Sequence, residues 1–361
     1  PQDAGRDTMP GLSWTAVVWH LATVLMAIAI AASAQAQQPA QYVIHISVDG
    51  LGSVYLDELL SKDRVPTFKR LQKEAAWTHN ARTDADYTIT LPNHTCMVTA
   101  RAVSGSDGHN WSDNSDPKPG RTLHSHKPPY VCSTFDVAHD AGLPTAMFAG
   151  KTKFSLFDVS YNARNGAPDK TGDDNGNDKL DTYVMTGASD ALTKAFIEKM
   201  SAEPFGYVFI HYAAPDSAGH AQGWGSEGYN RSVIEVDQGI GQILKMVDDS
   251  EKLRGKTAII ITADHGGLGK NHQDPNDIRI SSIPFYVWGA GVKAGTDLYK
   301  LNPTTRKDPA NNARPKYTDP VQPIRNGDSG NLALDLLGLR AIPGSTINAK
   351  QDLAVAETED K

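Results

Sequence analysis

The sequence predicts an α/β fold of three layers, in which helices cover both faces of a mainly parallel central sheet. Short apolar runs rich in β-branched residues alternate with helical patterns, and this alternation is typical of parallel sheets. The hydrophobic content of 39% and charged content of 21% exclude disorder as the main state. No repeat of fixed period is present, which excludes solenoids and propellers.

Five apolar runs are expected to form strands: Tyr42–Val48, Thr145–Phe148, Tyr207–Tyr212, Thr257–Thr262 and Pro284–Trp288. The clearest helical pattern covers Tyr229–Asp248, where six apolar side chains from Val233 to Val247 recur on one stripe. Further helices are expected at Thr67–Ala76, Ser133–Ala141, Ala188–Met200 and Ser329–Leu337. Two segments rich in Gly, Asn, Asp and Pro, Ser104–Pro129 and Tyr161–Lys179, are predicted to be long loops.

The N-terminus has the pattern of an export signal. An apolar run from Trp14 to Ala32 is followed by Ala34-Gln35-Ala36, the small-x-small pattern of a cleavage site. An uncleaved membrane anchor is the alternative, but small residues rather than Lys or Arg end the run. We therefore expect a signal peptide over residues 1–36 and a linker over 37–41, with the chain working in the periplasm or outside the cell.

One domain is expected over residues 42–345, followed by a polar tail over 346–361. The net charge of -7 argues against a large nucleic-acid interface, which needs a basic surface. Two cysteines, Cys96 and Cys132, are too few for a disulfide scaffold or a four-cysteine zinc site. Once the signal is cleaved, no stable membrane span is expected, and the sequence indicates no oligomeric state.

Acidic and imidazole side chains follow three of the expected strands. Asp49 follows the first strand, Asp216 and His220 follow the third, and Asp264, His265 and His272 follow the fourth. Each residue alone is explained by a turn, a helix cap or a surface position. Because ligands bind beyond the carboxyl ends of parallel strands, we expect all six side chains in one crevice. Their mutual repulsion there would be costly without cations.

Mixed Asp and His ligands without thiolate suit Zn²⁺, with Mn²⁺ or Fe as weaker alternatives. Six such side chains are enough for two ions. A nucleophile is expected at Thr90, which precedes Leu91-Pro92 at a predicted helix start. A hydroxyl beside a metal ionises more readily and can attack phosphorus. From spacing alone, a simple helix cap at Thr90 is equally compatible.

These motifs stand in the order found in the alkaline phosphatase superfamily. They most resemble the motifs of the type I phosphodiesterase/nucleotide pyrophosphatase family. The matching residues are Asp49-Gly50, Thr90-Leu91-Pro92-Asn93-His94, Asp216 to His220, Asp264 to Gly267 and His272. The resemblance covers roughly residues 42 to 345. It implies an alkaline phosphatase-like fold and two Zn²⁺ ions.

The resemblance also implies individual roles. Thr90 matches the nucleophile, and Asn114 matches the residue that binds a phosphoryl oxygen. Asn110 stands where the family has Gly, and the segment from Thr90 to Asn114 is slightly longer than in the family. The ligands implied for the ion beside Thr90 are Asp49, Asp264 and His265. The ligands implied for the second ion are Asp216, His220 and His272, and His272 is followed by Gln where the family has Gly.

The activity implied is hydrolysis of a phosphodiester or pyrophosphate bond through a phosphothreonine, with a small phosphoester such as a nucleotide as substrate. The main alternative is an alkaline phosphatase-type phosphomonoesterase. Lys151 and Lys153 follow the second expected strand, where some threonine-type alkaline phosphatases carry a Lys-x-Arg pair that grips phosphate. A solvated lysine pair is the other interpretation. Transfer of a phosphoalcohol group and a metal-binding protein without catalysis remain further alternatives.

Overall fold

The computed structural model describes residues 39–125, 129–169, 175–310 and 314–356. The signal peptide expected over residues 1–36 lies outside this part of the chain and stays a prediction. Within the described residues, none of the helices has the length and apolar content that crossing a bilayer requires.

The central sheet has eight strands in the order β4-β3-β5-β1-β6-β7-β2-β8. Only β7 runs antiparallel to its neighbours β6 and β2, and the other pairs are parallel. The predicted mainly parallel sheet is therefore confirmed. The strands are β1 (Tyr42–Val48), β2 (Ala75–Arg82), β3 (Thr145–Ala149), β4 (Thr182–Met185), β5 (Tyr207–Tyr212), β6 (Thr257–Thr262), β7 (Ser282–Gly289) and β8 (Thr296–Asp297).

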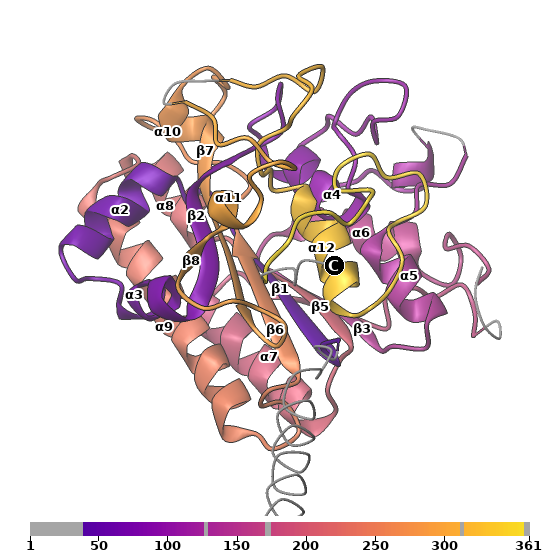
Figure 1. The fold of residues 1–361 in the computed structure, drawn as a ribbon. Helices are drawn as coiled ribbons and strands as arrows, with labels where there is room; N and C mark the ends of the chain where they lie inside the picture. Colours follow the sequence, from indigo (N-terminus) through magenta and orange to yellow (C-terminus); the bar gives the residue numbers. More distant parts are fainter. Residues whose placement is uncertain (1–38, 126–128, 170–174, 311–313, 357–361) are drawn as a thin grey trace, which may run out of the picture. The chain divides into compact units, whose positions relative to one another are not determined.

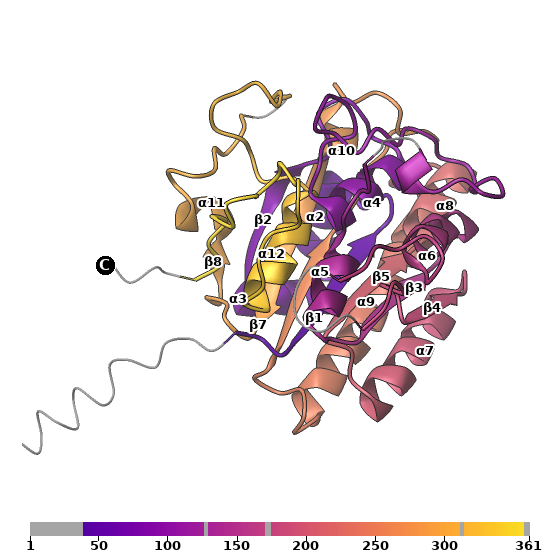
Figure 2. The ribbon, with the colours of Figure 1, turned by 90° about the vertical axis from the view of Figure 1, so that its right-hand side faces the viewer.

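The helices form two groups on opposite faces of the sheet (Figure 1). The first group contains α2, α3, α7, α8 and α9. Helices α3, α7 and α8 each contact α9, and α2 contacts α3. The second group contains α4, α5 and α12, which contact one another, and Figure 2 shows α5 and α12 in front of the sheet. The bounds are α2 (Ser53–Ser61), α3 (Pro66–Glu74), α4 (Thr90–Thr99), α5 (Thr134–Asp140), α6 (Ser155–Tyr161), α7 (Ser189–Ala202), α8 (Ala214–Gln222), α9 (Glu227–Asp249), α10 (Ile278–Ser281), α11 (Leu298–Leu301) and α12 (Asp328–Leu336).

Local sequence signals explain where the helices begin. The Ser226 hydroxyl oxygen accepts a hydrogen bond from Tyr229 N and caps α9. Ser133 and Asp136 form a reciprocal capping box at the start of α5, which satisfies two backbone N–H groups that the helix leaves unpaired. The predicted apolar stripe of α9, from Val233 to Val247, is buried, because these side chains belong to the hydrophobic core.

The C-terminal segment predicted as a polar tail contributes to packing. Leu353 and Val355 are buried in the core, and the backbone N–H of Lys293 donates to the Val355 carbonyl. The described part of this segment, up to residue 356, therefore lies against the domain.

Candidate active site

The predicted strand ends meet at the middle of the sheet. Strand β1 lies between β5 and β6, with Ser47 opposite His211 on one side and Thr262 on the other. Asp49 follows β1, Asp264 follows β6, and Asp216 lies in the first turn of α8 after β5. Because the three strands are parallel neighbours, their carboxyl ends bring these carboxylates together.

Asp49, Asp264 and His265 form one group of fully buried side chains. His265 Nε2 lies 3.1 Å from Asp264 Oδ2 and 3.5 Å from Asp49 Oδ1. The other oxygen of Asp264 accepts hydrogen bonds from the backbone N–H groups of Gly50 and His265, at 3.0 and 2.9 Å. These bonds hold the carboxylate so that Oδ2 points into the group.

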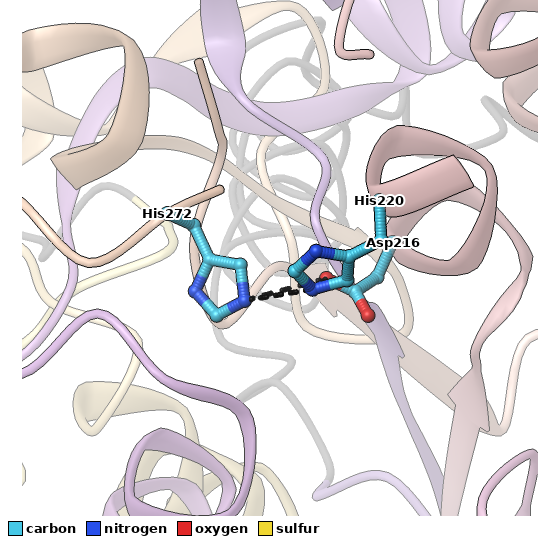
Figure 3. A group of neighbouring side chains, drawn as sticks. All are labelled: Asp216, His220 and His272. Carbon is cyan, nitrogen blue, oxygen red and sulfur yellow. Dashed lines mark hydrogen bonds and ion pairs between the residues drawn. The ribbon is translucent and has the colours of Figure 1, made fainter. Parts of the chain in front are cut away.

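Asp216, His220 and His272 form the second group (Figure 3). Asp216 Oδ1 lies 3.4 Å from His220 Nε2 and 3.7 Å from His272 Nε2. The two imidazole Nε2 atoms are 3.1 Å apart. Asp216 and His220 both belong to α8, where a spacing of four residues places side chains on one face of a helix.

In each of the three histidines of these groups, Nδ1 lies beside a backbone carbonyl. His220 Nδ1 is 2.9 Å from the Lys270 carbonyl, His272 Nδ1 is 2.6 Å from the Thr88 carbonyl, and His265 Nδ1 is 2.8 Å from the Gly266 carbonyl. A carbonyl oxygen only accepts, so each Nδ1 carries the proton. Each Nε2 then presents a lone pair toward the carboxylates, as a metal-ligating histidine does.

The two groups adjoin. The rings of His265 and His272 are stacked with centroids 3.7 Å apart and an interplanar angle of 9°. His265 Nε2 also lies 3.9 Å from Asp216 Oδ1 in the second group. The six side chains therefore form one continuous set of donor atoms.

This set fits metal ions. Within the described part of the chain, four buried atoms that face the groups lack a hydrogen-bond partner: Asp49 Oδ1, Asp216 Oδ1, Asp264 Oδ2 and His265 Nε2. Burial, reinforced by the charges of Asp49 and Asp216, raises the pKa of Asp264 well above its usual range. Burial lowers the pKa of His265 and His272, which favours neutral rings. Buried donor atoms of this kind are stabilised by cations.

Thr90 is the first residue of α4 and is buried. Asn114 lies beside it, because Asn114 Oδ1 accepts a hydrogen bond of 2.9 Å from the Leu91 N–H. The side chain of Asn110 instead donates to the carbonyls of Gly105 and Gly108. Of the two asparagines, Asn114 is therefore the one that lies at the start of α4.

Lys151 lies among the carboxylates. Its Nζ is 2.6 Å from Asp49 Oδ2 and 2.5 Å from Asp216 Oδ2, so it joins one carboxylate of each group. Burial opposes ionisation of Asp49, but the Lys151 ammonium and the His211 hydrogen bond hold the pKa of Asp49 well below its usual range. Lys153 is half-buried nearby, and burial together with the Lys151 charge lowers its pKa.

His211 is a residue to which sequence reasoning gave no role. Its Nδ1 accepts from the Gly150 N–H at 3.1 Å, so its Nε2 carries the proton and donates to Asp49 Oδ2 at 3.0 Å. The ring stacks on Phe154 with centroids 3.9 Å apart. The sequence could have indicated a role for His211, because it lies inside the apolar strand YVFIHY and a buried imidazole needs a hydrogen-bond partner.

Trp224 is a second residue without a predicted role. Its indole N–H donates to the Gly50 carbonyl at 2.9 Å, and its ring contacts those of His220 and His272. Gly50 has a φ of 77°, and a Cβ there would lie 2.9 Å from the Asp216 Cα. The glycine therefore allows the turn after β1 to approach α8.

A third group, His139, Asp140 and Asp169, lies elsewhere and contains its own cation. Lys179 Nζ lies 3.1 Å from Asp140 Oδ1 and also donates to Asp169. The lysine side chain is buried, so its ammonium compensates these carboxylates and this group does not require an ion.

Comparisons with known proteins agree with this fold. The family model described as type I phosphodiesterase / nucleotide pyrophosphatase matches residues 43–283. Murine ectonucleotide pyrophosphatase / phosphodiesterase 5, solved as an inactive variant in complex with AMP, is similar in structure with a TM-score of 0.59 and 15% identity. The similarity covers 87% of this chain and 99% of the murine chain.

Curated relatives are similar over shorter stretches. Human GPI ethanolamine phosphate transferase 1 is 30% identical over 156 residues, which are 41% of this chain and 16% of the relative. A 2,3-bisphosphoglycerate-independent phosphoglycerate mutase from Wolbachia pipientis wMel is 28% identical over 116 residues, covering 30% of this chain and 22% of the mutase. The chain thus matches less than a quarter of the length of these two relatives.

The fold is shared with a Vibrio parahaemolyticus protein described as belonging to the alkaline phosphatase superfamily, which is 15% identical with a TM-score of 0.52 over 88% of this chain and 71% of that chain. The match to the family model covers well over half of the chain. The chain belongs to the type I phosphodiesterase/nucleotide pyrophosphatase family.

Proposed function

We propose that this chain is an exported, two-zinc phosphodiesterase or nucleotide pyrophosphatase that acts through a phosphothreonine at Thr90. The observation that carries the proposal is the converging set of three carboxylates and three imidazoles, of which only His220 is exposed. Four of their buried donor atoms have no hydrogen-bond partner among the described residues. The family match and the AMP complex of the murine neighbour support a small phosphoester as substrate.

Asp49, Asp264 and His265 would hold the ion beside Thr90, and Asp216, His220 and His272 would hold the second. Bound zinc would supply Lewis acidity toward the phosphoryl group and lower the pKa of a nearby hydroxyl. Mn²⁺ or Fe would be alternative ions. No buried thiolate belongs to either group, which is consistent with this choice.

Thr90 Oγ1 would lose its proton to solvent and form a bond to phosphorus while the opposite bond, from phosphorus to the leaving oxygen, breaks. The Asn114 side-chain N–H₂ would then donate to a phosphoryl oxygen, because Asn114 Oδ1 is already bonded to the Leu91 N–H. The Leu91 N–H is occupied by that bond, so the Thr90 N–H is the backbone donor at the start of α4. Water would hydrolyse the phosphothreonine.

A phosphomonoesterase is the second candidate, and the position of Lys151 favours it. The Lys151 ammonium contacts Asp49 and Asp216, one carboxylate of each proposed metal group, so it would lie close to a phosphoryl group held between the two ions. A monoester carries one more negative charge than a diester above neutral pH, so a cation at this place favours the monoester. Transfer of a phosphoalcohol group is a third candidate, supported by the similarity to GPI ethanolamine phosphate transferase 1.

The deciding experiment compares kcat/KM for bis(p-nitrophenyl) phosphate and p-nitrophenyl phosphate, which share one leaving group. We expect the diester to be the better substrate. A monoester preference that collapses in Lys153→Ala would instead identify an alkaline phosphatase. Addition of ethanolamine or glycerol to the same assay tests transfer, because a transferase would release more p-nitrophenolate and form a new phosphodiester.

The two lysines give the first mutational prediction. We expect Lys153→Ala to lower monoester turnover more than diester turnover, because its charge acts on the extra charge of the monoester. The measurement is the ratio of the two kcat/KM values in wild type, Lys151→Ala and Lys153→Ala. An unchanged ratio in both variants would contradict a role for these lysines in substrate binding.

A further inference from the structure

A cavity of about 360 Å³ is lined by two segments that follow Asn114 and Lys151 in the chain, and its lining includes no residue of either metal group. One wall is the segment from Pro117 to Thr122. The other wall is α6 with the residues that follow it, from Ser155 to Asn165. The volume lies in the range of ~300–1,000 Å³ that is typical of small-molecule sites.

Three cations line this cavity: Lys118, Arg121 and Arg164. Among the described residues, neither Lys118 nor Arg164 has an ion pair with a carboxylate. Arg121 is held in place, since its Nη1 lies 2.8 Å from Asp113 Oδ2 and its guanidinium carbon lies 4.8 Å from the Trp111 ring centroid. In a chain with a net charge of -7, this cavity is a local concentration of positive charge.

Both walls begin at the candidate active site. Pro117 comes three residues after Asn114, so their Cα atoms are at most about 11 Å apart. Ser155 comes four residues after Lys151, which sets a limit of about 15 Å. The Thr152 hydroxyl donates to the carboxylate of Asp116 at 2.9 Å and joins the two walls at this end. A substrate with its scissile phosphate at Thr90 that extends past Asn114 and Lys151 would meet this end of the cavity.

We infer that this cavity binds a second phosphate group carried by the substrate. Arginine and lysine side chains recognise phosphate through charge-assisted hydrogen bonds. Pro117 and Val159 in the lining provide apolar contact for the carbon skeleton that joins the two phosphates. The inference rests on the proposed function, and it narrows the substrate class to organic phosphates that bear at least two phosphate groups.

The test uses Lys118→Gln/Arg164→Gln, which removes two exposed cations and leaves the proposed catalytic residues unchanged. The matched control is Lys194→Gln/Lys199→Gln, which removes the same charge from the exposed side of α7. Three substrates are compared: thymidine 5′-(p-nitrophenyl phosphate), its 3′-phosphorylated derivative, and ATP. The first carries no second phosphate, the second carries it on the nucleoside, and ATP carries two further phosphates on the leaving group.

We expect the cavity variant to lower kcat/KM at least 10-fold for ATP or for the 3′-phosphorylated substrate, and less than twofold for the unphosphorylated one. The substrate that is affected identifies the side on which the second phosphate lies. Equal effects on all three substrates, or equal effects in the α7 control, would overturn the inference, because they would indicate general electrostatic steering.

A binding measurement separates this inference from the proposed function. Isothermal titration of pyrophosphate into the purified protein and the cavity variant needs no turnover. We expect the dissociation constant to rise at least 10-fold in the cavity variant and to stay unchanged in the α7 control. Equal affinity in wild type and cavity variant would overturn the inference even if every substrate is hydrolysed. Weaker pyrophosphate binding by the cavity variant would support the inference even if no substrate is hydrolysed.

Discussion

Individual residues in the candidate active site are fixed by contacts that a motif does not reveal. Thr88 illustrates this, because its hydroxyl donates to the His272 carbonyl and its own carbonyl accepts from His272 Nδ1. Thr88 therefore positions a proposed metal ligand, whereas Thr90 lies at the start of α4 beside Asn114. Two threonines separated by one residue thus have different surroundings.

This difference gives a prediction for Thr90. Thr90→Ala should lower kcat on the order of 10³-fold or more, the scale expected when a nucleophile is removed. Metal content by elemental analysis should stay near that of wild type, since the proposed ligands remain. Thr88→Ala is the control and should lower kcat far less. An inactive Thr88→Ala beside a nearly normal Thr90→Ala would show that the nucleophile is assigned to the wrong threonine.

His211 gives a second prediction at this scale. The imidazole holds Asp49 through Nε2 and is itself held by the Gly150 N–H. His211→Asn should weaken zinc binding roughly 10–100-fold, as for other residues that orient metal ligands. The measurement is the zinc dissociation constant from competition with a chelator. His124→Asn is the control, because His124 lies in a short 3-10 helix and contacts the Ser160 carbonyl rather than a proposed ligand. Unchanged zinc affinity in His211→Asn would contradict this role.

The strands and helices differ in how well the sequence predicts them. The predictions for β1, β5 and β6 match the structure residue for residue, because strands buried on both faces read as continuous apolar runs. Strand β2 was missed, since AAWTHNAR mixes polar and apolar residues directly after a helix. Edge strand β4 is half-exposed and pairs only with β3, so its short sequence carries little signal.

The same contrast applies to the candidate site. All six proposed ligands follow predicted strands, so the rule that ligands bind beyond the carboxyl ends of parallel strands predicts that these side chains lie close together. The two adjoining groups confirm this. Helix α8 was not predicted, because APDSAGHAQ has no apolar stripe. Its role is to place Asp216 and His220 one turn apart. The contacts of Lys151, His211 and Trp224 depend on long-range packing that a local pattern does not encode.

Strand β1 gives a prediction at the scale of elements. His45 is fully buried within it, and burial lowers its pKa to about 3. The unfolded chain takes up a proton near the usual value of about 6.5, so this histidine costs stability as pH falls below 6.5. The cost is about 2 kcal/mol at pH 5 and grows until the pH reaches the folded value.

The measurement is the free energy of unfolding from urea titrations between pH 7 and pH 5. The free energy of unfolding of wild type should fall between pH 7 and pH 5. In His45→Leu this fall should be smaller by about 2 kcal/mol. The absolute stability of the variant is not the readout, because His45 also contacts the Tyr207 hydroxyl. If the free energy of unfolding depends on pH in the same way in both proteins, His45 is not buried in its neutral form.

At the scale of the whole molecule, the sheet gathers charge that the fold alone does not neutralise. Three carboxylates converge where β1, β5 and β6 end, and Lys151 compensates two of them. Metal binding should therefore contribute to folding as well as to chemistry. We expect dialysis against a chelator to lower the melting temperature, and zinc to restore it. His265→Ala should lose both metal and stability.

We propose that hydrolysis of a phosphodiester by this chain depends on metal held by these six side chains. The most direct test measures zinc content by elemental analysis and kcat/KM for bis(p-nitrophenyl) phosphate on the same sample, before and after chelation. We expect close to two zinc equivalents per chain, loss of activity together with the metal, and recovery when zinc is returned. Full activity in a sample that contains no metal would contradict it.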